Sequence, residues 1–202
     1  MVKVKICGIT NLKDAELAVR YGADALGFVF AESPRRVNPD TVREIAGAIG
    51  PFTTLVGVFV NQTADGILKT ASSCRLDALQ LHGEESPDFC RKLAPYKVIK
   101  TFRMGSLFSI QTPKKYPVDA YLFETEGAGR GGTGRTWEWE KLPRKKVTRP
   151  FLVSGGLNPA NVARAVQILK PYAVDVSSGV EAKPGAKDPV LLQKFIQNAK
   201  NT

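Results

Sequence analysis

Short β-branched and aromatic runs alternate with helical patterns along nearly all of the 202 residues. Strands that alternate with helices form right-handed βαβ units, and these units build a parallel sheet. The runs predict strands over residues 2–7, 25–30, 53–60, 76–81, 97–102, 118–123, 150–153 and 173–177. The helical patterns cover residues 11–21, 39–49, 64–73, 86–94, 159–169 and 189–200, with a weak helix near 106–110. Thr10 and Asn158 are the expected caps of the helices over 11–21 and 159–169.

Eight such units in 202 residues average about 25 residues each, close to the minimum for a closed (β/α)8 barrel. An open doubly wound sheet, usually of five or six strands, is the alternative. Eight equal units without a break in composition favour closure. We therefore expect an α/β protein, a single (β/α)8 TIM barrel over residues 1–202 with short loops and a weak fifth helix.

The cysteines bear on metal binding and on the compartment. Cys7, Cys74 and Cys90 are odd in number and form no CxxC pair, and His82 is the only histidine. We therefore expect no metal site and a reduced, cytoplasmic protein. No apolar run approaches 18 residues and the amino terminus has no apolar leader segment, so no membrane span is expected.

The net charge of +10 is concentrated in the second half of the chain, where residues 102–202 contribute +8. Its densest part is a basic run between Lys141 and Arg149. A basic cluster can contact nucleic acid, but no aromatic residues interleave with this one. We interpret it as a solvated connection on the barrel face opposite the site, and expect no nucleic-acid partner.

The carboxyl ends of the strands carry the functional groups in a barrel of this type. Lys5 and Cys7 share one face of the first strand, where a lysine needs a partner or a ligand. Cys7 is a candidate nucleophile or base, because a lowered pKa makes a thiolate useful near pH 7. Such a cysteine more often serves as a small, buried apolar side chain. Gln80 and His82 share a face at the end of the fourth strand.

The sixth strand ends at Glu124 and leads into a glycine-rich loop. Within the loop, Gly127, Gly129 and Gly132 match GxGxxG, and residues 129–136 resemble a Walker A motif with Arg135 in place of lysine. Both motifs need an apolar helix immediately afterwards, and TWEWEKLPRKK does not supply one. A loop that folds over a substrate is the better interpretation.

Glycines and hydroxyls follow the last two strands. Gly155 and Gly156 follow the seventh strand, and Ser177 and Ser178 follow the eighth. Loops at these positions form the recurrent phosphate site of such barrels, with tight turns and helix caps as the ordinary alternative. The residues alone thus indicate an enzyme acting on a small phosphorylated molecule, without specifying the reaction.

The strand-end motifs resemble those of one known family, phosphoribosylanthranilate isomerase. The resemblance rests on KICGIT at residues 5–10, GVFVN at 57–61, LQLHGE at 79–84, SGGLN at 154–158 and VDVSSGVE at 174–181. It extends from residue 4 to about residue 198. It implies an Amadori rearrangement of N-(5'-phosphoribosyl)anthranilate in tryptophan biosynthesis, with no cofactor and with a monomeric or homodimeric enzyme.

The resemblance also implies roles for individual residues. Cys7 would be the general base and Glu124 the general acid, although the family has an aspartate where this chain has Glu124. The longer side chain could misplace the acid by about 1 Å, which can lower the rate on the order of 100-fold. Glu126 is a minor candidate for the same role. The implied substrate-binding residues are Lys5, Arg35, Gln80, His82 and Asp175, and the implied phosphate-binding residues are Gly155, Gly156, Ser177 and Ser178.

Two other functions remain as alternatives. One is another phosphate-binding barrel, such as indoleglycerol-phosphate synthase or a sugar isomerase of histidine biosynthesis, which would share only the phosphate loops. The other is a non-catalytic module that binds nucleic acid.

Overall fold

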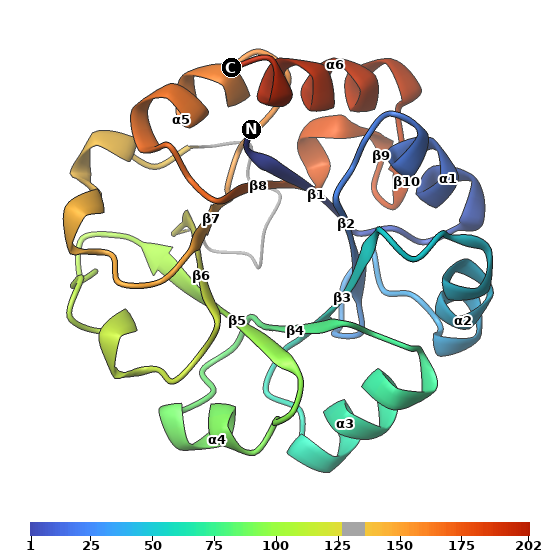
Figure 1. The fold of residues 1–202 in the computed structure, drawn as a ribbon, viewed down its shortest axis with the longest axis horizontal. Coiled ribbons are helices and arrows are strands. Elements are labelled where there is room, and N and C mark those ends of the chain that lie inside the picture. Colours follow the sequence, from blue (N-terminus) through green and yellow to red (C-terminus); the bar gives the residue numbers. More distant parts are fainter. Residues whose placement is uncertain (127–135) are drawn as a thin grey trace.

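The predicted strands form one closed parallel barrel in the computed structural model of the chain, which describes residues 1–126 and 136–202. Each strand pairs with the next, and the eighth returns to the first (Figure 1), so the predicted TIM barrel is confirmed. The barrel strands are β1 (Lys3–Cys7), β2 (Ala25–Val29), β3 (Thr54–Phe59), β4 (Ala78–Leu81), β5 (Lys97–Met104), β6 (Ala120–Thr125), β7 (Phe151–Val153) and β8 (Ala173–Val176).

Helices surround the barrel, as Figure 1 shows in a view along its axis. Within the described residues they are α1 (Leu12–Arg20), α2 (Pro39–Ala48), α3 (Ala64–Ser73), α4 (Pro87–Arg91), α5 (Val162–Leu169) and α6 (Pro189–Lys200). They bury the outward-facing side chains of the strands, among them Ile6, Leu26 and Leu79, in the main apolar core. None of these helices has the length and apolarity needed to cross a membrane.

The barrel interior changes in character along its axis. Ile99, Ala120, Leu122, Leu152 and Ala173 form a small apolar cluster of their own. Further toward the carboxyl ends of the strands the buried side chains are polar, namely Lys5, Gln80, Thr101, Glu124 and Asp175. Buried polar groups need partners or ligands, so this end of the barrel is where a site is expected.

The weak helix expected near residues 106–110 is wrong. Strand β5 continues to Met104, and the connection that follows contains only a short 3-10 helix, Pro113–Lys115. Phe108 packs edge-on against Phe123, with ring centroids 5.7 Å apart. This contact anchors the connection on the barrel in a turn conformation, where an isolated short helix would be marginal.

The expected caps also differ. Asn11, not Thr10, caps α1, because the Thr10 hydroxyl donates to the carbonyl of Gly185 instead. Asn158 accepts from the backbone N–H of Ala160 in a turn, and α5 begins only after Asn161. The partner of Thr10 belongs to a hairpin that the sequence analysis missed, formed by β9 (Glu181–Lys183) and β10 (Ala186–Lys187).

The basic run lies at the amino ends of the strands, as expected. It begins at the end of the 3-10 helix Trp139–Lys141 and contains the 3-10 helix Arg144–Lys146, and both helices precede β7. Arg144 and Arg149 line a surface hollow together with Lys170 and Tyr172, which precede β8. This face is opposite the carboxyl ends of the strands, so the run does not contribute to a site there.

Candidate active site

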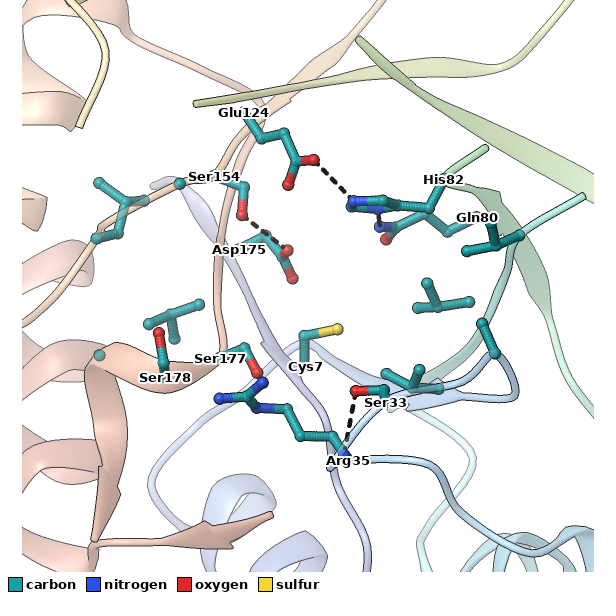
Figure 2. Close-up of a pocket in the computed structure, with 18 of the residues that line it drawn as sticks. Cys7, Ser33, Arg35, Gln80, His82, Glu124, Ser154, Asp175, Ser177 and Ser178 are labelled. Carbon is teal, nitrogen blue, oxygen red and sulfur yellow. Dashed lines mark hydrogen bonds and ion pairs between the residues drawn. The ribbon is translucent and has the colours of Figure 1, made fainter. Parts of the chain in front are cut away.

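A pocket opens at the carboxyl ends of the strands, with a volume of about 800 Å³ counted out to its mouth. Cys7 and Glu124 face it from opposite sides (Figure 2). Ten of the eleven residues expected at the site line this one pocket, and these are Cys7, Arg35, Gln80, His82, Glu124, Gly155, Gly156, Asp175, Ser177 and Ser178. The remaining residue, Lys5, is not among the lining residues. The glycine-rich loop over residues 127–135 lies outside the described residues, and so does the hypothesis that it folds over a substrate.

Lys5 lies beneath the pocket, in a buried ion pair. Its Nζ is 2.7 Å from Oδ1 of Asp175, and the two side chains are only 2% and 6% exposed. The other oxygen of Asp175 accepts from the hydroxyl of Ser154 at 3.1 Å. Burial lowers the pKa of Lys5, but Asp175 and Cys7 outweigh it and raise the pKa above its ordinary value. Lys5 is therefore a buried cation beside the thiol.

Cys7 and this cation both lie against Gly27 of the neighbouring strand. A Cβ atom on Gly27 would come within 2.8 Å of the Cys7 Sγ and 2.9 Å of the Lys5 Nζ, so a larger residue there would displace them. Burial raises the pKa of the Cys7 thiol, Lys5 opposes this, and the pKa stays above its ordinary value. These surroundings therefore do not lower the pKa of the thiol, and the role of Cys7 as a base stays a prediction. The cations limit the rise rather than reverse it.

Glu124 is fixed by the histidine at the end of β4. The Nε2 of His82 is 2.7 Å from Oε1 of Glu124. The amide nitrogen of Gln80 lies 3.1 Å from Nδ1 of His82, and an amide N–H can only donate. Nδ1 is therefore the acceptor, Nε2 carries the proton, and His82 donates to Glu124. The longer carboxylic acid of this chain thus has a specific partner.

Two buried polar atoms in the pocket have no hydrogen-bond partner among the described residues. They are Oε1 of Gln80 and Oγ of Ser177. Buried polar atoms without a partner are destabilising and therefore uncommon in folded proteins. Both residues line the pocket, so a polar ligand there can supply the missing bonds.

The loops after β7 and β8 contribute the expected anion site. Gly155 and Gly156 have φ angles of +88° and +67°, a conformation that favours glycine. A Cβ on Gly155 would also lie 2.4 Å from the backbone nitrogen of Thr125. Across from these glycines, Ser178 begins a short 3-10 helix after β8. Successive backbone N–H groups in such turns form a concave surface that binds anions.

Arg35 reaches the pocket from the segment after β2, and its guanidinium group is bound by a residue that the sequence analysis did not select. Its Nε and Nη2 donate to the two carboxylate oxygens of Glu181, at 2.8 Å and 2.7 Å. Lys187 also contacts Glu181, at 2.9 Å. Glu181 ends the VDVSSGVE motif, which is a signal that could have found it. Lys187 has no such signal, because it precedes a helix in a hairpin of ordinary sequence.

A closed parallel barrel that holds a thiol, a carboxylic acid and a glycine–serine anion site at one end defines an enzyme of the phosphate-binding (β/α)8 class. Residues 4–198 match the family model of N-(5'-phosphoribosyl)anthranilate (PRA) isomerase. The chain therefore belongs to the PRA isomerase family, and not to the synthase or sugar isomerase families that were the alternatives.

Individual relatives support this assignment over the full length. The N-(5'-phosphoribosyl)anthranilate isomerase of Geobacter sulfurreducens is 48% identical, with 99% of each chain aligned. The crystal structure of phosphoribosyl anthranilate isomerase from Thermotoga maritima superposes with a TM-score of 0.92 at 44% identity and covers both chains completely. A crystal structure of the isomerase in complex with reduced 1-(o-carboxyphenylamino)-1-deoxyribulose 5-phosphate gives a TM-score of 0.89 at 43% identity, again over both complete chains.

Proposed function

We propose that this chain converts N-(5'-phosphoribosyl)anthranilate to 1-(o-carboxyphenylamino)-1-deoxyribulose 5-phosphate, with Glu124 as the general acid and Cys7 as the general base. The observation that carries this proposal is the placement of both groups in one pocket with the anion site of the β7 and β8 loops. An Amadori rearrangement needs one proton donor and one proton acceptor that reach neighbouring atoms of a sugar. The family membership supplies the substrate class.

The substrate would bind through its two anionic ends. Its phosphate fits the loops of Gly155, Gly156, Ser177 and Ser178, where the unpartnered Ser177 hydroxyl can donate to a phosphate oxygen. Its anthranilate carboxylate fits Arg35, whose guanidinium group lies beside Ser177 in the same pocket (Figure 2). Two anchored ends hold the ribose between the acid and the base, which replaces diffusive encounter by a fixed approach.

The chemistry then takes two proton transfers. Glu124 protonates the furanose ring oxygen, the C1'–O bond breaks, and the nitrogen lone pair forms a Schiff base. His82 donates to Oε1 of Glu124, which leaves Oε2 to carry the proton that is transferred. The Cys7 thiolate removes the proton from C2', and the resulting enolamine tautomerises to the ketone. One proton is given and one is taken, so the reaction balances without a cofactor.

Lys5, Gln80 and Asp175 belong to the same proposal. Gln80 lines the pocket and can accept from a sugar hydroxyl through its unpartnered Oε1. Lys5 and Asp175 are paired with each other beneath Cys7, so their proposed contribution to substrate binding acts through the charge at the pocket floor.

The experiment that tests the proposal is a fluorescence assay with freshly prepared N-(5'-phosphoribosyl)anthranilate. The parent enzyme should turn the substrate over, and Glu124→Gln should lower kcat by about 100-fold or more because the amide cannot donate a carboxylic proton. An unchanged kcat in Glu124→Gln would overturn the role of Glu124. Glu124→Asp tests the longer side chain: a higher kcat in this variant would show that the extra methylene is a handicap despite its bond to His82.

We further propose that the enzyme is cytoplasmic, that it acts as a monomer or homodimer, and that it binds neither membranes nor nucleic acid. All three cysteines are unpaired and buried, which suits a reducing compartment. Among the related structures are monomers generated from the dimeric Thermotoga maritima isomerase. Light scattering on the purified chain distinguishes the two states, and a strongly salt-dependent binding to DNA would contradict the expected absence of a nucleic-acid partner.

A further inference from the structure

Arg35 is held in place by a carboxylate rather than directed freely into the pocket. Its Nε lies 2.8 Å and 3.1 Å from the two oxygens of Glu181, and its Nη2 lies 2.7 Å from the second oxygen. A bidentate pair of this kind fixes the plane of the guanidinium group. Nη1 makes no hydrogen bond to the described residues, so both of its N–H groups, and the second N–H of Nη2, can be offered to a ligand.

Glu181 is in turn held by groups outside the pocket. Lys187 donates to its Oε1 at 2.9 Å, and the backbone N–H of Gly185 points to the same oxygen at 3.4 Å. The side chains of Glu181 and Lys187 are 4% and 0% exposed. Burial raises the pKa of Glu181, but Arg35 and Lys187 outweigh it, and the pKa lies below its ordinary value. Glu181 is therefore an ionised carboxylate between two cations.

Lys187 connects the Glu181 carboxylate to β1, the strand that ends at Cys7. Its Nζ also donates to the carbonyl of Cys7 at 2.7 Å and to the carbonyl of Ser177 at 3.2 Å. Its own backbone N–H donates to Asp14 at 2.9 Å, which anchors the hairpin on helix α1. The same lysine thus contacts the ends of β1 and β8 and the carboxylate that orients Arg35.

The charges of the three groups leave one net positive charge beside the pocket. Arg35 and protonated Lys187 are cations and Glu181 is an anion; burial lowers the pKa of Lys187, and Glu181 opposes this without reversing it. Without Lys187 the carboxylate would cancel the charge of Arg35, and without Glu181 the guanidinium group would have no fixed orientation. A fixed guanidinium that keeps a net positive charge is suited to recognising a planar carboxylate.

We propose that Glu181 and Lys187 are positioning residues that orient Arg35 and thereby give the enzyme its selectivity for a substrate with a carboxylate on its aromatic ring. This inference rests on the proposed role of Arg35. Neither residue is required to touch the substrate. The structure predicts that their loss affects recognition of the carboxylate more than it affects the proton transfers.

The test compares kcat/KM for two substrates, N-(5'-phosphoribosyl)anthranilate and N-(5'-phosphoribosyl)aniline, which lacks the carboxylate. Glu181→Gln should lower kcat/KM for N-(5'-phosphoribosyl)anthranilate by about 10- to 100-fold, mainly through KM, because glutamine has one acceptor oxygen where Glu181 uses two to bind the guanidinium group. The value for the second should change by no more than about twofold. Lys187→Met should also lower the selectivity ratio, which is kcat/KM for N-(5'-phosphoribosyl)anthranilate divided by kcat/KM for N-(5'-phosphoribosyl)aniline. A merely structural role would lower both values equally and leave the ratio unchanged.

Three further variants make the outcome decisive. Asp24→Asn is the matched control, because Asp24 also binds two lysines, Lys3 and Lys200, but lies away from the pocket, and it should leave the ratio unchanged. Arg35→Met should remove the preference for the substrate with the carboxylate, measured as the ratio of the two kcat/KM values. If the preference remains, the proposed role of Arg35 has failed rather than that of Glu181. Glu181→Asp keeps the charge on a shorter side chain and covers the case in which the other variants do not fold. A parental ratio in folded Glu181→Gln or Glu181→Asp would overturn the inference.

Discussion

The two sides of the pocket hold their reactive groups by different means. On the β1–β8 side, Lys5 and Asp175 are direct register partners in the sheet and carry Cys7 above them. On the β4–β6 side, Glu124 is held through the side chain of His82, which lies two strands away in the barrel. The base, Cys7, is thus positioned by the backbone pairing of β1 with β8. The acid, Glu124, is positioned by its bond to the side chain of His82.

Both sides also depend on a buried lysine–carboxylate pair, used in different ways. The Lys5 pair lies directly beneath the thiol. The second pair, Lys100 with Glu85 at 2.9 Å, holds the loop after β4 through backbone bonds. Glu85 accepts from the N–H groups of Asn61 and Gly83, and Lys100 donates to the carbonyl of Gly83. The first pair should therefore govern reactivity, and the second should govern stability.

The largest effect is expected on the β1–β8 side, from Cys7→Ser. A hydroxyl is far less acidic than a thiol, so kcat should fall by about 100- to 10,000-fold while the fold is retained. Steady-state kinetics and circular dichroism measure the two properties. Cys74→Ala is the control, since Cys74 is fully buried outside the pocket and its loss should leave kcat close to the parent value. Near-normal turnover in Cys7→Ser would contradict the proposed base.

The next largest effect is on stability, from Glu85→Gln on the β4–β6 side. Removing the carboxylate leaves the buried Lys100 charge without a counter-charge, with the carbonyl of Gly83 as its remaining partner, which should lower the free energy of unfolding by about 3 kcal/mol at pH 7. Burial raises the pKa of Glu85, but Lys100 and backbone donors outweigh it, so the pKa in the folded state lies below the ordinary value of 4.5. Its contribution is thus present above that value and lost as the pH falls through the lower folded-state value.

Urea denaturation of Glu85→Gln and the parent at pH 7 and pH 3 checks both parts. The difference in the free energy of unfolding should be large at pH 7 and smaller at pH 3. An equal difference at the two pH values would show that the carboxylate charge contributes nothing.

The comparison also shows what could be predicted from the sequence. The β1–β8 side depends on strand periodicity, which placed Lys5 and Cys7 on one face. The resemblance to a family added Asp175. The bond between His82 and Glu124 could not be read from spacing, because it joins side chains 42 positions apart whose rotamers are set by packing. The same holds for Arg35 and Glu181, which are separated by 146 positions.

The local errors have local causes. The helix expected near 106–110 is replaced by turns because a tertiary contact of Phe108 overrides a weak propensity. Thr10 has the residue type of a helix cap, but its hydroxyl is used by the β9–β10 hairpin, which the sequence pattern did not reveal. In both cases the competing partner is distant in the sequence.

A smaller effect is expected from His82→Asn, which removes the bond between His82 and the carboxyl group of Glu124. The shorter amide cannot keep the 2.7 Å bond to Glu124, so kcat should fall by about 10- to 100-fold. The informative measurement is the double variant with Glu124→Gln. If His82 acts through Glu124, the second substitution should add little to the first. Fully multiplicative losses would show that His82 acts on the substrate directly instead.

The smallest effect concerns the charge beneath the thiol. Lys5→Met should raise the pKa of Cys7 and slow its alkylation by iodoacetamide at pH 8 about tenfold, because only the thiolate reacts. Among the charged groups around the thiol, Lys5 has the largest effect on this pKa. Asp175→Asn should act in the opposite sense and speed alkylation.

Lys3→Met is the control, since Lys3 lies on the same strand but pairs with Asp24 outside the pocket. Peptide mapping separates Cys7 from the other two cysteines, and equal alkylation rates in the parent and Lys5→Met would show that the buried pair supports the fold without tuning the base.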